Sequence, residues 1–97
     1  MSTTSNSDEF YEKLKGQLHE TNSWPAEYLY KFIVKSDAVK IAKLEVIFDN
    51  MGAVISTVES KNGKYTSVSV NLLMRNPDSV IQKYQEVAEK IEGVISL

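Results

Sequence analysis

Cysteine is absent from this 97-residue chain, and histidine occurs once, as His19. Without cysteine the chain has no disulfide framework, no thiol nucleophile and no cysteine-ligated zinc or iron–sulfur site. A single histidine leaves only carboxylate-based metal sites, and no partner constellation accompanies His19, so we predict neither a metal centre nor a cofactor. With 42% hydrophobic and 25% charged residues, the composition is typical of one soluble globular domain.

Long apolar runs and an excess of positive charge are also missing. No run of about 18 apolar residues occurs, and the start, MSTTSNSDEF, has neither a basic nor an apolar segment. We therefore expect no membrane association and a cytoplasmic location by default. The net charge of −2 argues against binding to nucleic acid, whose phosphates need clustered lysine and arginine.

Apolar periodicity and capping signals predict three helices and four strands. Residues 1–7 are small and polar, and we expect them to form a disordered tail. The predicted elements that follow are a helix over 8–21, a strand over 27–36, a helix that Ser36 or Asp37 caps and Gly52 ends, strands over 53–60 and 65–75, a helix that Asn76 caps and Gly93 ends, and a short strand over 94–97.

The order of these elements predicts an α+β fold. Asn62-Gly63 is a strong hairpin signal of type I′, in which the glycine needs a positive φ, and it joins the two middle strands. After the first helix the order is β-α-β-β-α-β, which makes residues 26–97 a ferredoxin-like sandwich with an extra N-terminal helix. Right-handed crossovers give an antiparallel sheet in the order 4-1-3-2, with both helices on one face and the other face open.

The open face supplies the candidate site. Period two in the strand over 65–75 turns the valines inward and the serines outward, next to the lysines of the first strand. The candidate ligand or partner surface consists of Lys31, Ser60, Lys64, Tyr65, Ser67 and Ser69. A simpler interpretation stays open, because any antiparallel sheet with one wet face carries small polar residues there.

Catalysis and RNA binding are not favoured by the pattern. A serine nucleophile needs a base within hydrogen-bond reach, and the sequence offers none. Glu86, Glu89 and Glu92 have the spacing of a solvated helix flank. RNA-recognition domains of this topology stack bases on outward aromatic side chains of the third strand, where this chain has Ser67 and Ser69.

Three motifs resemble the YbeD-like family of small bacterial proteins, whose function is unknown and whose structures look like regulatory ACT domains. The first is WPAEYLYKFIV at 24–34, which matches an aromatic-Pro and Tyr-Lys opening of the first strand. The second, at 60–68, matches a Ser-x-x-Gly-x-Tyr-x-Ser-Val pattern, and the third is the ending GVISL. The resemblance covers residues 22–97, with Trp24 where the family usually has phenylalanine.

The resemblance implies an ACT-like regulatory or partner-binding module without catalytic residues. Two functions stay open: a protein-interaction module that acts through its open face or an edge strand, and a sensor of a small molecule such as an amino acid or a cofactor. The segment AVISTVES at 53–60 has no charge before Glu59 and no proline, so it is a poorly protected edge, and we expect a homodimer. Phe10, Leu14 and Leu18 of the first helix could fold over the open face or dock on a second subunit.

Overall fold

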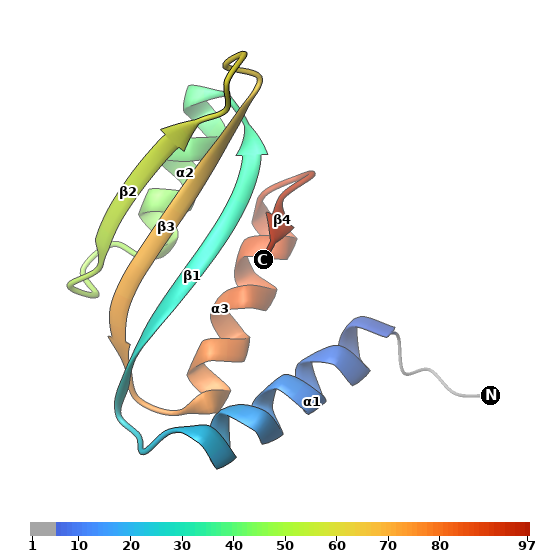
Figure 1. Cartoon of the computed structure of the whole chain (residues 1–97), viewed down its shortest axis with the longest axis vertical. Helices are drawn as coiled ribbons and strands as arrows, with labels where there is room; N and C mark the ends of the chain where they lie inside the picture. The colour runs from blue at the N-terminus through green and yellow to red at the C-terminus, as the bar shows by residue number, and fades with distance from the viewer. Residues whose placement is uncertain (1–5) are drawn as a thin grey trace.

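The computed structural model describes residues 6–97 and shows helices packed on a four-stranded antiparallel sheet (Figure 1). Its elements are α1 (Asn6–Thr21), β1 (Ala26–Lys35), α2 (Ala38–Ile47), β2 (Val54–Glu59), β3 (Tyr65–Met74), α3 (Pro77–Lys90) and β4 (Ile95–Ser96). The predicted α+β class and order of elements are confirmed. Helix α1 starts two residues before its predicted start, and the rest of the predicted tail, residues 1–5, lies outside the described residues.

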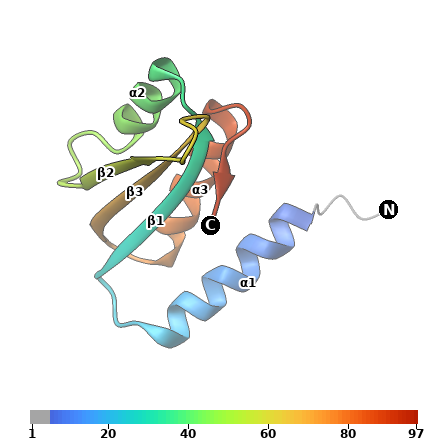
Figure 2. The same ribbon diagram turned by 45° about the horizontal axis from the view of Figure 1, so that its top comes forward.

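The sheet has the strand order β2-β3-β1-β4, so that β3 and β1 are central. Counted from the β4 edge the same order reads 4-1-3-2, and each strand therefore has the neighbours that the sequence predicts. Helices α2 and α3 lie on one side of the sheet (Figures 1 and 2). The arrangement is compatible with a small ferredoxin-like fold. We call the sheet face away from α2 and α3 the open face.

Strand β1 buries its aromatic side, as its alternation predicts. Tyr30, Phe32 and Val34 are buried, whereas Lys31 and Lys35 are exposed. Strand β3 obeys the same period of two, and its buried side chains meet those of β1 and of the helices. The core residues from β3, α2 and α3 are Val68, Val70, Leu72, Met74, Leu44, Ile47, Val80, Tyr84 and Val87.

Helix α2 is shorter than the sequence predicts. Asp37 caps it as expected, because its carboxylate accepts a hydrogen bond from Val39 N at 2.8 Å. The helix ends at Ile47, however, five residues before Gly52, so the prediction that Gly52 ends it was wrong. A contact from another element favours the earlier end: Lys83 Nζ donates to the Ile47 carbonyl at 2.8 Å, which gives a terminal helix carbonyl a partner.

The β2–β3 hairpin closes through a five-residue loop rather than a two-residue turn. Gly63 has the predicted positive φ, at 73°, but Asn62 does not share it, so the type I′ prediction was wrong. The loop is closed by its own polar groups: Gly63 N donates to the Ser60 carbonyl at 2.8 Å, and Lys64 N donates to Asn62 Oδ1 at 3.1 Å. This Asn side-chain hydrogen bond provides the chain reversal that a type I′ turn would have supplied.

Gly63→Val is expected to destabilise the hairpin by about 1–2 kcal/mol, because a β-branched residue at this φ is strained. A Cβ would lie 3.6 Å from Glu59 Oε2, an ordinary contact, so the cost comes from the backbone and not from a clash. Urea unfolding followed by circular dichroism measures the change. Gly16→Val is the matched control, since no φ in the strained range and no atom within 4 Å opposes a Cβ there. Equal losses for both variants would contradict this explanation.

Helix α3 begins with the predicted cap. Asn76 Oδ1 accepts a hydrogen bond from Ser79 N at 2.9 Å, and Asn76 N donates to Ser79 Oγ at 3.3 Å, which forms a reciprocal capping box. Pro77 follows in the first turn, where its missing N–H costs nothing. The fixed start sets the helix so that Tyr84 projects onto the aromatic side of β1.

Helix α1 packs against α3 and does not cover the open face. The Tyr11 ring stacks on the Tyr84 ring with centroids 6.5 Å apart, and Lys15 Nζ lies 2.8 Å from Asp78 Oδ1. At the end of the helix, Trp24 Nε1 donates to the Leu18 carbonyl at 3.0 Å. Of the apolar residues that the sequence analysis named on this helix, Leu18 is buried, but Phe10 is 59% exposed because Tyr11 turns toward α3 in its place.

A cluster of tyrosines links β1 to α3. Tyr30 Oη donates to the Val80 carbonyl at 3.0 Å, and the hydroxyls of Tyr28 and Tyr84 lie 2.7 Å apart. Burial raises the pKa of Tyr30 and of Tyr84 well above the ordinary tyrosine value of about 10. Above that pH the unfolded chain loses protons that the folded chain retains.

The protein is therefore expected to lose stability in alkali. Since the unfolded state binds fewer protons above pH ~10, the two tyrosines together lower the free energy of unfolding by up to about 2.7 kcal/mol per pH unit. Urea unfolding at a series of alkaline pH values tests this. Tyr30→Phe removes one of the two titrating groups and should roughly halve the slope; an equal slope in wild type and variant would contradict the assignment.

Strand β4 is a short edge strand that pairs with the middle of β1, as predicted for the chain's last residues. Ile95 lies opposite Ile33, Ser96 lies opposite Phe32, and Leu97 N donates to the Lys31 carbonyl at 2.9 Å. Because residues that face each other share a face, Ile95 and Leu97 add to the open face. Within residues 6–97, every helix is too short or too polar to span a bilayer.

Candidate functional site

The six residues of the predicted surface form two groups rather than one site. Lys31 lies opposite Ser69 in the middle of the open face, and Ser67 lies opposite Ile33 in the next row. The other three residues, Ser60, Lys64 and Tyr65, lie at the hairpin end of the sheet. Five residues of extended chain separate Lys64 from Ser69, which is roughly 16 Å. A single small molecule would therefore not reach from Lys64 to Ser69, and the two groups adjoin only where Tyr65 lies two residues from Ser67 on β3.

The hairpin group is largely engaged in its own structure. Ser60 Oγ donates to Asn62 Oδ1 at 3.1 Å and accepts a hydrogen bond from Tyr65 N at 3.0 Å. The ammonium of Lys64 lies 5.6 Å from the centre of the Tyr65 ring, within the range of a cation–π contact. These contacts hold the loop, and the polar groups that remain free for a partner are Lys31, Ser67 and Ser69.

The open face also carries most of the exposed apolar side chains, which the sequence analysis did not include. Of the ten large hydrophobic residues that are exposed in the described chain, seven lie on this face, and they are 37% to 73% exposed. These seven are Leu29, Val54, Val58, Tyr65, Leu73, Ile95 and Leu97. The outward positions of the strand patterns could have identified most of them.

Cross-strand register arranges the open face in rows. The central row consists of Lys31, Ser69 and Ser56, which lie side by side on β1, β3 and β2. The neighbouring rows combine apolar and polar residues, such as Leu29 with Asn71. The open face therefore has a polar centre with apolar side chains around it, and these apolar side chains come from all four strands.

Charge on the open face is carried by a few groups on β1. Glu27, Lys31 and Lys35 are exposed and share this face at intervals of four residues. A carboxylate at one end of the strand and ammonium groups at its middle and its other end give the face a charge gradient along β1. Among residues 6–97, no three histidine, aspartate or glutamate side chains come together to hold a metal ion.

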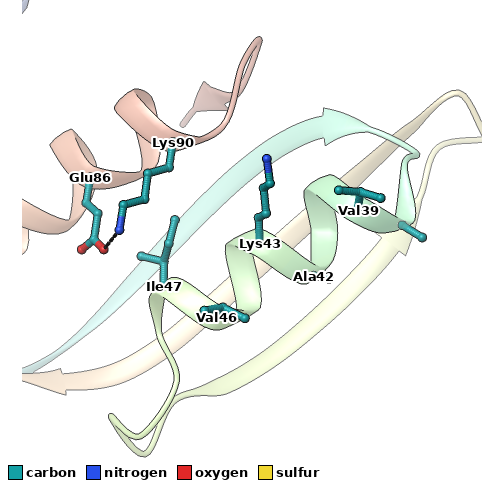
Figure 3. Close-up of a pocket in the computed structure, with 8 residues that line it drawn as sticks. Val39, Ala42, Lys43, Val46, Ile47, Glu86 and Lys90 are labelled. Carbon is teal, nitrogen blue, oxygen red and sulfur yellow. Dashed lines mark hydrogen bonds and ion pairs between the residues drawn. The ribbon is translucent and has the colours of Figure 1, made fainter.

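The helix side of the molecule carries a separate apolar hollow, between α2 and α3 (Figure 3). Its volume is about 680 Å³, and α2 contributes Val39, Ala42 and Val46 to its wall. From α3, Glu86 forms ion pairs with Lys83 and Lys90, each at 2.9 Å. Hydrogen bonds from these two lysines, Lys90 first, lower the pKa of Glu86 below its ordinary value. None of the six predicted site residues lines this hollow.

Comparison with protein families, with curated proteins and with solved structures gives no match to this chain. Its function therefore has to be argued from the open face and the hollow themselves.

Proposed function

We propose that this protein is a non-catalytic interaction module that docks a protein partner on its open sheet face, with the ACT-like form of the ferredoxin-like fold and a YbeD-like sequence. The observation that carries the proposal is the gathering of seven of the ten exposed large hydrophobic residues on one face. Exposed apolar side chains that gather on one face of a soluble protein and are bordered by polar groups indicate an interaction site, whereas ones scattered singly do not.

The chemistry of the open face fits binding better than catalysis. Lys31 and Ser67 are exposed and Ser69 is half-buried, so water reaches the only cross-strand serine–lysine pair of the central row. Catalytic groups work in sites that exclude water and direct several donors at a reacting atom. An apolar surface with a few polar groups is instead the composition of a protein interface.

Photocrosslinking tests the proposal. A photoreactive residue in place of Ser67 on the open face is expected to crosslink the chain to a discrete protein partner in its native host, and the same probe in place of the exposed Gln85 on α3 is not. The double variant Leu29→Ser/Leu73→Ser should abolish the crosslink from Ser67. Val39→Ser/Val46→Ser, which removes two equally exposed apolar side chains from α2, should leave it. Crosslinking from Gln85 alone would overturn the proposal.

The hollow between α2 and α3 supports a second candidate, a sensor of a small molecule. Its volume of about 680 Å³ lies within the usual range for ligand sites, and its apolar wall is bordered by Lys43 and Lys90. A thermal-melt screen against amino acids, nucleotides and common cofactors tests this candidate, since a ligand that binds the folded state raises the midpoint. Val46→Asp should abolish any shift that arises in the hollow, while Lys31→Ala should not.

A further inference from the structure

We infer that the partner of the open face is a second copy of this chain, packed face to face about a two-fold axis at the central row. This inference rests on the proposed function, because it names the partner of the same surface. The axis runs between the two sheets and across their strands, so each strand meets its own copy in the opposite direction. Each residue then faces the residue equally far from the central row on the other side.

Strand β1 is complementary to itself about Lys31. Leu29 and Ile33 lie two residues from Lys31 in the two directions, and Glu27 and Lys35 lie four residues away. In the paired copies Leu29 packs on the partner's Ile33, and the Glu27 carboxylate meets the ammonium of the partner's Lys35. The two-fold axis makes each of these contacts twice.

Strand β3 shows the same relation about Ser69. Leu73 and Tyr65 lie four residues from Ser69 in the two directions, and both are exposed apolar side chains. Asn71 and Ser67 lie two residues away, and both are polar. Apolar side chains therefore meet apolar ones across the axis, and hydrogen-bonding groups meet each other.

Strand β2 completes the pattern about Ser56. Val54 and Val58 flank Ser56 on the open face and are 73% and 68% exposed, so the two valines pack on each other across the axis. Register places Ser56 level with Ser69 and Lys31. One axis therefore serves all three strands.

If the axis is moved by one row in either direction, the side chains that face each other match less well. An axis at Ile33 would place Lys31 opposite the partner's Lys35 at two symmetric places, so two pairs of ammonium groups meet instead of the single Lys31 pair at the central row. An axis at Leu29 would place the apolar Leu73 opposite the polar Ser69. The first shift doubles the like-charge contacts and the second sets apolar side chains against polar ones, so both are less favourable than the central row.

The open face has the area of a weak, reversible pair. Strands β1 and β3 have ten residues each and β2 has six. At about 3.3 Å per residue and 4.8 Å between strands, the flat face of these three strands covers roughly 410 Å² per copy. Two copies bury about 820 Å² before the relief of the side chains and the contribution of β4 are added, which is the size of a weak or transient interface.

Lys31 distinguishes self-pairing from binding of another protein, because in the pair it lies on the axis and faces the partner's Lys31. The two ammonium groups repel each other, while the hydroxyl of Ser69 on the neighbouring strand offers an acceptor. Lys31→Met removes the repulsion and adds apolar area, so it is expected to tighten the dimer about tenfold. Loss of a lysine from the surface used by an acidic partner would weaken binding instead.

Charge reversal tests the position of the two-fold axis. The dimer dissociation constant of the full chain and of each variant is measured by sedimentation equilibrium. Glu27→Lys and Lys35→Glu should each weaken the dimer about tenfold, because each reversal sets like charges together at two symmetric places. The double variant Glu27→Lys/Lys35→Glu should restore the wild-type constant. Glu45→Lys on the exposed side of α2 is the control and should change nothing. Thermal melts confirm that each variant is folded.

A wild-type chain that stays monomeric up to about 1 mM would overturn self-pairing. So would single reversals without effect, or a double variant as weak as the single ones. The crosslinking experiment separates this inference from the proposed function: a Ser67 crosslink to a different protein would overturn self-pairing and leave the proposed function standing. A crosslinked product of twice the chain's mass would support both.

Discussion

Val70→Asp is expected to leave the protein unfolded under native conditions. Val70 has no exposed surface and lies in the centre of β3, opposite Tyr30 on one side and Ile55 on the other. A carboxylate there loses its hydration without a charged partner, and its neutral form still places an unpaired hydroxyl in an apolar core. The cost of several kcal/mol is comparable to the whole stability of a small domain.

Circular dichroism and amide NMR spectra measure this outcome directly. The control is Ser67→Asp, which introduces the same side chain three residues earlier in the same strand but on the open face, where Ser67 is exposed. We expect this control to keep its native spectrum and a similar unfolding midpoint. If both variants fold equally well, the assignment of the inward and outward faces of β3 is wrong.

Tyr84→Ala is expected to lower the free energy of unfolding by about 3–5 kcal/mol, because it removes the ring that joins three elements. Tyr84 is 5% exposed, and its ring centre lies 4.9 Å from that of Tyr30 and 6.1 Å from that of Phe32. The same ring supports Tyr11 of α1. The variant should therefore loosen α1 as well as the core.

Urea unfolding gives the size of this loss, and hydrogen exchange of the α1 amides reports the loosening of the helix. Tyr84→Phe keeps the ring and removes only the hydroxyl contact with Tyr28, so its expected cost is about 1 kcal/mol. The difference between the two variants isolates the packing of the ring. A Tyr84→Ala loss no larger than that of Tyr84→Phe would show that the ring does not hold α1, α3 and β1 together.

The two interaction surfaces considered for this chain make different demands on β2. Sheet extension through the predicted edge requires only the outer backbone of β2, which is an edge strand in the structure. Face-to-face pairing requires Val54 and Val58, which point from β2 onto the open face. The apolar side chains of β1, β3 and β4 lie on that same face, and this agreement among four strands favours the face over the edge as the main surface.

Much of this fold can be derived from local sequence. Alternation in β1 and β3 predicts which side chains are buried, because a strand turns successive residues to opposite faces whatever its neighbours are. Asp37 and Asn76 predict the starts of α2 and α3, since a side chain satisfies free backbone amides within its own turn. These signals act over a few residues of the chain, so they can be identified without knowledge of the contacts that the segment makes.

Other features depend on contacts between distant parts of the chain. Helix α2 ends at Ile47, where Lys83 of α3 donates a hydrogen bond to its last carbonyl. Helix α1 lies on α3, where the Tyr11 ring stacks on the Tyr84 ring. Neither position follows from apolar periodicity, which identifies the side of a helix that is buried but not the element that buries it.

The candidate site shows the same division. The sequence by itself determined that Lys31, Ser67 and Ser69 point to the open face, and it placed Ser60 and Lys64 at the hairpin. Only the tertiary structure showed that Ser60 is engaged in hydrogen bonds within the hairpin, and only it brought apolar residues of four strands around the central row. The physical reason is that strand register joins residues that lie tens of positions apart, and register follows from packing of the whole sheet on its helices rather than from any one segment.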